Sequence, residues 1–283
     1  MRSLLTSAAA LAVLSATPAA SMGHAGIMGY ALANDGMTLV TMQSIAAPGE
    51  IMTFDLAEPI SAIAYRPVTG ELYGIAEGKV VTIDPMSGAI TDTMATFADD
   101  ATLGDGPVAF DFNNAIDAVR AVSASGSNLV YFPDGFGDND ERAGSVLRFT
   151  DPFYAAGDTN EGQTPEVFAN AYTNAVSMMT AGSTFQYGFD SQTNALVSLA
   201  NNAGTLETVG FTTVDGETVD LIPSGGFDIV SPEEGTDLAF AILQFDGAET
   251  AGLYQVDLTS GALTPLADLG TGGFTGFAIS MGM

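Results

Sequence analysis

The sequence predicts an all-β protein, and three observations indicate that its strands form a single β-propeller. Short alternating or β-branched runs bounded by Gly, Asn, Asp and Pro occur throughout, whereas stretches with helical periodicity are scarce. A unit of four short strands recurs at intervals of about 40 to 60 residues, the range of a propeller blade. A strand near the C-terminus is left over once these units have been assigned.

The clearest unit lies between Ser61 and Met94. Its first strand and the turn after it lie within residues 61–70, and the last two strands are joined by the tight turn Pro85-Met-Ser-Gly88. Parts of the unit recur later in the chain, so the repeat is a property of the whole sequence. These recurrences are residues 108–112, 186–190, 204–210, 226–229 and 253–266.

Five units can be counted, and they begin near Tyr30, Ser61, Val108, Ala171 and Gly225. The first unit has no inner strand of its own, and residues 273–280 resemble the inner strand at residues 225–229. If the C-terminal strand pairs into the N-terminal blade, the ring closes and leaves no open edge. We therefore predict one propeller of five four-stranded blades over residues 28–283.

The N-terminus predicts export. Arg2 precedes the uncharged apolar stretch 4–16, and small residues favour cleavage after Ser21. We expect a signal peptide at residues 1–21, a short tail at 22–27 and a monomer in the periplasm or outside the cell. No later apolar run is long enough to span a membrane.

The chain is strongly acidic: 34 Asp and Glu oppose 6 Lys and Arg, for a formal net charge of −28. Such a surface repels nucleic acid and anionic membranes. The acids are scattered, which favours adaptation to a salty medium over one acidic patch. Of the few basic residues, Arg66 and Arg120 are expected to pair with nearby acids. There is no cysteine, so the core must hold the fold without disulfides.

Several catalytic classes are excluded. His24 is the only histidine, and it lies outside every predicted blade. Ser-His-Asp and Cys-His catalysis therefore lack a base, and zinc sites built on His or Cys lack ligands. Carboxylates therefore remain as the candidate catalytic or metal-binding groups.

Two acidic loops could hold calcium, which prefers carboxylate and carbonyl oxygens. Neither has the spacing of an EF-hand loop, and the alternative is that both are simply solvated. The candidate ligands are Asp134, Asp138, Asp140 and Glu141 in one loop, and Asp158, Asn160 and Glu161 in the other.

Asp111 and Asp228 form a third candidate. Each follows an aromatic residue of an inner strand, at the place that Ala64 and Ala278 occupy in other units. Both carboxylates could therefore lie near the propeller axis, as a cation site or as an acid/base pair for hydrolysis. The alternative is that each accepts hydrogen bonds from backbone amides at a turn.

Three segments resemble a known family, the bacterial domain of unknown function 4394. They are residues 65–74, Tyr-Arg-Pro-Val-Thr-Gly-Glu-Leu-Tyr-Gly; residues 110–129, which include Phe-Asp-Phe-Asn and Val-Arg-Ala-Val-Ser; and residues 154–174, with Tyr-Ala-Ala-Gly-Asp-Thr-Asn-Glu-Gly. The insertion at 134–141 departs from the simpler turn of the family. The resemblance implies an exported propeller-like domain and no activity.

Together these observations predict an exported, non-catalytic binding or scaffolding propeller, with an unknown ligand and with calcium as a candidate stabiliser. The alternative is a carboxylate- or metal-dependent hydrolase, glycosidase-like or lactonase-like, with its site at the axis. Asp111 and Asp228 are the residues that separate the two interpretations.

Overall fold

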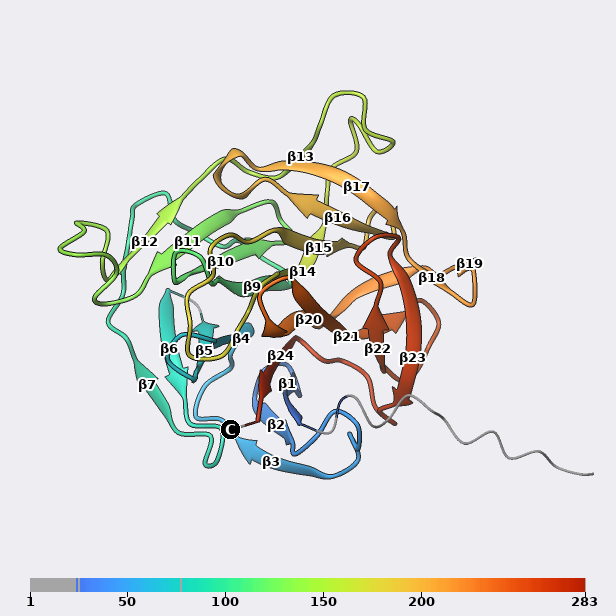
Figure 1. The fold of residues 1–283 in the computed structure, drawn as a ribbon, viewed down its shortest axis with the longest axis horizontal. Coiled ribbons are helices and arrows are strands. Elements are labelled where there is room, and N and C mark those ends of the chain that lie inside the picture. Colours follow the sequence, from blue (N-terminus) through green and yellow to red (C-terminus); the bar gives the residue numbers. More distant parts are fainter. Residues whose placement is uncertain (1–23, 25, 77, 283) are drawn as a thin grey trace, which may run out of the picture.

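The computed structural model describes residue 24, residues 26–76 and residues 78–282. In these residues, five β-sheets surround a common axis as a five-bladed propeller, which confirms the predicted fold (Figure 1). Over the same residues, no helix is long and apolar enough to cross a membrane. The predicted signal peptide, residues 1–21, lies outside the described part of the chain. Just after it, His24 packs edge-on against Phe240, with ring centroids 4.8 Å apart.

Blades 1 and 2 have four strands each, which follow one another from the axis outward. Blade 1 consists of β24 (Gly276–Met281), β1 (Ile27–Ala33), β2 (Thr38–Met42) and β3 (Ile51–Asp55). Blade 2 consists of β4 (Ala62–Arg66), β5 (Glu71–Ala76), β6 (Lys79–Ile83) and β7 (Ile90–Asp92).

Blades 3, 4 and 5 have the same four strands plus short strands on the outer edge. Blade 3 consists of β9 (Val108–Asn113), β10 (Ala118–Ser123), β11 (Asn128–Phe132), β12 (Ser145–Arg148) and outermost β8 (Thr96–Phe97). Blade 4 consists of β14 (Val167–Tyr172), β15 (Gln186–Asp190), β16 (Ala195–Leu199), β17 (Thr205–Phe211) and outermost β13 (Phe153–Tyr154). Blade 5 consists of β20 (Leu221–Glu233), β21 (Thr236–Phe245), β22 (Gly252–Val256), β23 (Ala262–Asp268), β18 (Thr213–Val214) and β19 (Glu217–Thr218).

The added strands β8, β13 and β18 are parallel to the outer strands that they cover. Each lies in the segment that connects the preceding blade to this one. That segment runs along the outer edge of the sheet before it reaches the inner strand. The fourth unit also begins earlier than the sequence suggested, at Val167 rather than near Ala171. A register shift between Val167 and Ala169 breaks the regular alternation there and hides the start of the strand.

The ring closes as predicted. β24 pairs antiparallel with β1, and Tyr30 lies opposite Ala278 in this register. Gly226 allows the inner strand of blade 5 to approach β24, because a Cβ at this position would collide with the main-chain nitrogen of Phe277. The C-terminal strand thus supplies the inner edge that the first blade lacks.

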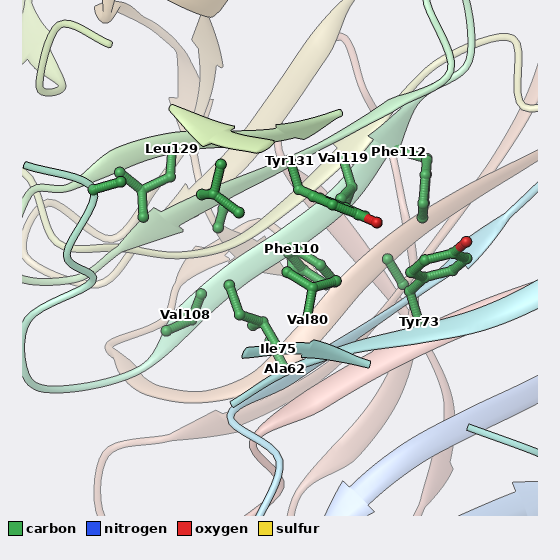
Figure 2. Packing of buried hydrophobic residues seen from close by; sticks show 14 residues of the cluster. Ala62, Tyr73, Ile75, Val80, Val108, Phe110, Phe112, Val119, Leu129 and Tyr131 are labelled. Carbon is green, nitrogen blue, oxygen red and sulfur yellow. The ribbon is translucent and has the colours of Figure 1, made fainter. Parts of the chain in front are cut away.

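Apolar side chains fill the spaces between neighbouring blades. Between blades 2 and 3, Tyr73 and Ile75 face Phe110, Val119 and Tyr131, and all five are buried (Figure 2). The side chains of a strand alternate between its two faces, so one inner strand contributes to two such interfaces. This alternation explains why β9, β10, β11 and β14 are buried along their whole length.

The repeated turns have a local cause. In the turn that follows β6, Asp84 accepts hydrogen bonds from the Met86 amide and the Ser87 hydroxyl, and Gly88 adopts a φ of 71°. After β22, Asp257 and Gly261 repeat this arrangement, with Gly261 at a φ of 77°. An Asp that caps its own turn, followed by a left-handed glycine, ends the third strand and starts the fourth.

The inner strands all run in the same direction along the axis. Early residues of all five inner strands, among them Val108 and Gly276, line one end of the axis, and later residues such as Asp111 and Met281 line the other. We call the end where these strands begin the upper face and the opposite end the lower face.

Replacing Phe277 by Ala should lower the free energy of unfolding by about 3–5 kcal/mol, because this residue of β24 is 2% exposed between blades 5 and 1. Phe153→Ala is the matched control, since Phe153 is 48% exposed, and it should change stability by about 0.5 kcal/mol or less. Urea unfolding of both variants measures the difference. Equal losses in the two variants would contradict the role assigned to the closing strand.

Candidate functional site

Asp111 and Asp228 lie on the inner strands of blades 3 and 5, and both line one small cavity at the lower end of the axis. Each residue is 4% exposed. The cavity has a volume of about 10 Å³, close to the space that one water molecule occupies. The structure therefore brings together the two carboxylates that the repeat alignment had paired.

Both carboxylates accept hydrogen bonds from main-chain amides of the next blade. The Tyr172 N–H of blade 4 donates to Asp111 at 2.7 Å. The Ile279 N–H of blade 1 donates to Asp228 at 2.6 Å, and the Ile229 N–H donates to its other oxygen at 2.6 Å. Each Asp thus connects its own inner strand to that of a neighbouring blade. The donors are amides within strands, not the turn amides that the backbone-amide interpretation expected.

The pKa values of both carboxyl groups are raised. Burial raises the pKa of Asp111 well above its usual value, and the negative charge of Asp228 raises it further. Burial also raises the pKa of Asp228, to about 7, although the amides of Ile279 and Ile229 act in the opposite direction. Two like charges facing one enclosed space disfavour double ionisation, so the pair holds a proton to higher pH than an exposed carboxyl group would.

The lower end of the axis is closed by residues 173–185, which we call the cap loop (yellow in Figure 1). Main-chain hydrogen bonds tie it to three other blades. Met178 N–H donates to the Pro67 carbonyl at 2.8 Å, Ala181 N–H donates to that of Asn114 at 3.0 Å, and Ala175 C=O accepts from the Ser231 amide at 3.2 Å. Ala175 and Ser177 of the loop also line the cavity of the two aspartates.

This geometry limits what the aspartate pair can do. A sugar or lactone needs a cleft that admits it beside both carboxylates, and inverting glycosidases separate their acids by about 6.5–9.5 Å to admit water as well. In this protein the shared space holds about one water, and the oxygens of Asp228 already accept amide hydrogens. The pair is built to connect blades.

Asp111→Asn should stabilise the protein near neutral pH. A carboxyl group with a raised pKa in the folded state contributes stability that is complete below its unfolded pKa, near 4, and is lost as pH rises through its folded pKa. Asn keeps an acceptor for the Tyr172 amide but cannot ionise. We expect a gain of about 1–3 kcal/mol near pH 8 that shrinks toward zero near pH 4, measured by urea unfolding.

The control is Asp99→Asn, which removes an exposed negative charge from the same acidic chain. Both variants are compared in about 0.5 M NaCl, which screens the surface charges but not the buried pair. A stability–pH curve for Asp111→Asn that runs parallel to that of the parent would show that the pair does not titrate in this range.

The loop between β11 and β12 contains Asp134, Asp138, Asp140 and Glu141. Arg142 Nε and Nη2 donate to the two carboxylate oxygens of Asp140 at 2.9 and 2.7 Å, and these bonds lower the pKa of Asp140 to about 2. Across the described residues, no three His, Asp or Glu side chains are grouped closely enough to hold a metal ion. In this loop the observed partner of Asp140 is an arginine.

Asp158, Asn160 and Glu161 lie on the upper face, in the segment that enters blade 4. Asp158 accepts hydrogen bonds from the Thr208 amide at 2.6 Å, the Thr208 hydroxyl at 2.7 Å and the Asn160 amide at 2.8 Å. Burial acts to raise the pKa of Asp158, but these hydrogen bonds outweigh it and lower the pKa. Glu161 accepts from the Gly157 amide at 2.8 Å. Asp158 thus fastens this loop to β17.

Asp158→Ala should therefore lower the free energy of unfolding by about 1–2 kcal/mol through the loss of these hydrogen bonds. The loss should be the same in millimolar calcium and in excess chelator, as followed by thermal or urea unfolding. A loss that occurs only when calcium is present would instead identify Asp158 as a calcium ligand.

The two arginines behave differently from each other. Arg66 forms the expected ion pair, with Nε 2.8 Å from an oxygen of Asp117. Arg120 is 3% exposed, and in the described part of the chain it has no acidic partner within salt-bridge distance, so that expectation is wrong. It donates instead to the Tyr172 hydroxyl at 2.8 Å and to amide oxygens of Asn128 and Asn202.

A cavity of about 660 Å³ opens on the upper face between blades 2 and 3, and sequence reasoning missed it. Most of its wall belongs to the segment between β8 and β9, and Ser61 and Gly78 of blade 2 complete it. The signal was a connection longer than a blade-to-blade turn requires, in which Ala98, Ala101 and Leu103 precede the Gly-rich residues 104–106. Its apolar lining residues are Phe97, Ala98, Ala101, Leu103 and Val108.

Comparison with family models decides the relationship that the motifs suggested. The model described as "Domain of unknown function (DUF4394)" matches residues 37–278. The chain belongs to this family. The match begins within blade 1 and ends in β24, so it covers the ring almost completely. No curated protein matches the chain.

The solved structures that resemble this one have low sequence identity to the chain. A structural genomics protein of unknown function from Bacteroides thetaiotaomicron has a TM-score of 0.45 and 13% identity, over 89% of this chain and 56% of that one. A chain of a nidogen/laminin complex has a TM-score of 0.46 and 12% identity, over 89% and 97%. An auxiliary nutrient binding protein from Bacteroides thetaiotaomicron has a TM-score of 0.42 and 12% identity, over 75% and 55%. This chain thus spans about half the length of the two Bacteroides proteins.

Proposed function

We propose that this protein is an exported, non-catalytic binding propeller whose ligand site is the cavity between blades 2 and 3. The observation that carries the proposal is the size of this cavity. Its 660 Å³ falls within the range of about 300–1,000 Å³ that is typical of small-molecule sites. The two cavities on the axis hold about 10 Å³ each, which is too little for an organic ligand.

The lining favours a particular class of ligand. Phe97, Ala98, Ala101 and Leu103 offer an apolar wall, while Ser61 and Thr102 add hydroxyl groups. Asp105 is the one ionisable residue in the described lining, and it is exposed at the edge. With a net charge of −28 on the chain, an anionic ligand is repelled. We infer an apolar molecule that is uncharged or carries a single positive charge.

The same lining supports binding rather than conversion. General acid–base hydrolysis requires titratable groups positioned on both sides of the scissile bond, and the described residues that line this cavity include a single carboxylate. The buried aspartate pair at the axis accepts amide hydrogens within a closed space. These features favour the binding interpretation over the hydrolase interpretation.

Two fluorescent probes of similar shape test the site. N-phenyl-1-naphthylamine is neutral, and 1-anilinonaphthalene-8-sulfonate is its anionic relative. We expect the neutral probe to bind with saturable fluorescence enhancement and the anionic probe to bind at least about tenfold more weakly, equivalent to about 1.4 kcal/mol. Equal binding of the two probes would contradict the ligand class.

The variant Ala98→Trp places an indole in the cavity and should abolish binding of the neutral probe. Ala143→Trp is the matched control, because Ala143 is exposed in the loop between β11 and β12 on the lower face, and binding should be unchanged. Circular dichroism confirms that both variants fold. If the folded Ala98→Trp protein binds as the parent does, the cavity is not the site.

A further inference from the structure

Five equivalent positions of the inner strands surround the upper part of the axis. The cross-strand partners on the second strands are Gly74, Ala121, Gly188, Ala241 and Ala31, which fixes the equivalence. Four of the five positions are apolar and one carries an amide. In blade order 2, 3, 4, 5 and 1 the residues are Ile63, Phe110, Asn170, Phe227 and Phe277.

Asn170 is 1% exposed, and neither its Oδ1 nor its Nδ2 has a hydrogen-bond partner in the described part of the protein. A buried amide without partners loses its hydration and gains nothing in return, so such groups are rare in folded proteins. Apolar side chains at the four equivalent positions show that packing does not require an amide at this place. Because the described residues supply no partner, a bound small molecule is the direct explanation.

The space for that partner is present. Asn170 lines the cavity at the upper end of the axis together with residues from all four other inner strands, and the volume of this cavity is about 10 Å³. Main-chain N–H groups alternate in direction along a strand, and that of Tyr172 points away from β15 to reach Asp111. The N–H of Asn170, two residues earlier, points the same way. Asn170 thus borders a space the size of one water molecule, and its main-chain N–H lies on the same edge of the strand as that of Tyr172.

We propose that this cavity holds a single ordered water molecule bound by Asn170. The choice among small ligands follows from the two unpartnered atoms. A cation would satisfy Oδ1 and leave Nδ2 without an acceptor, whereas an anion would satisfy Nδ2 and leave Oδ1 without a donor. Water both donates and accepts, so one molecule satisfies both atoms. It links the inner strand of blade 4 to the other strands around the axis.

A crystal structure of the protein grown in sodium bromide tests the site directly. We expect one peak within about 2.7–3.2 Å of both Oδ1 and Nδ2, without anomalous signal from bromine. An anomalous peak at this position would identify an anion site and overturn the proposal. Contacts of about 2.3–2.6 Å to oxygens would identify a cation and also overturn it. An empty cavity at a resolution that shows other buried waters would do the same.

Asn170→Leu provides a second readout, because Leu resembles the residues of the other blades. If water satisfies Asn170 in the parent, the substitution removes the amide together with its bound water. The melting midpoint should then shift by less than about 3 °C. A rise of more than about 3 °C would mean that the amide was unsatisfied in the parent, which contradicts the proposal. Should this variant fail to fold, the crystal of the parent protein decides the question alone.

Discussion

The burial of apolar side chains between neighbouring blades holds this ring together, and the other features of the structure depend on it. The chain has no cysteine, so no disulfide fixes the position of one blade on the next. Each blade contacts mainly its two neighbours, as in other repeat architectures, where stability is largely a sum of units and interfaces. The pairing of β24 with β1 removes the two free ends of that series. Closure thus gives every blade two packed faces.

Several buried polar groups form hydrogen bonds across the boundary between two blades. At the boundary of blades 3 and 4, Arg120 donates to Tyr172 and to two asparagines, and Asp111 accepts from the Tyr172 amide. At the boundary of blades 5 and 1, Asp228 performs the same task as Asp111. Because a buried polar group is stable only with a specific partner, these contacts fix the register of one blade against the next more narrowly than apolar packing can. The pKa values of the two aspartates are raised because burial and mutual repulsion disfavour two negative charges in one enclosed space.

The sequence was informative wherever a feature repeats. Alternating runs, the Asp84-to-Gly88 type of turn and the spare C-terminal strand were sufficient to predict five blades and their closure. The alignment of Asp111 and Asp228 with Ala64 and Ala278 also placed both carboxylates near the axis, because equivalent positions in a ring converge on its centre. These inferences needed only local pattern and symmetry.

Features that break the repeat could not be predicted in this way. The cap loop is a long connection within blade 4, and only the fold reveals that it reaches Pro67, Asn114 and Ser231. The edge strands β8, β13 and β18 are two residues long, too short for a periodic pattern. Arg120 and the cavity between blades 2 and 3 depend on contacts between segments distant in sequence. In the loop of Asp140, charge density does not reveal that this carboxylate pairs with the neighbouring Arg142.

In the register of blade 1, Ile27 at the start of β1 lies directly opposite Met281 at the end of β24. The two ends of the ring are therefore neighbours, and a short linker between them would leave every blade with its present contacts. New ends could then be opened in an exposed turn between two other blades, in a circular permutant that keeps the same sheets. The folded ring therefore does not depend on which blade comes first in the amino-acid sequence.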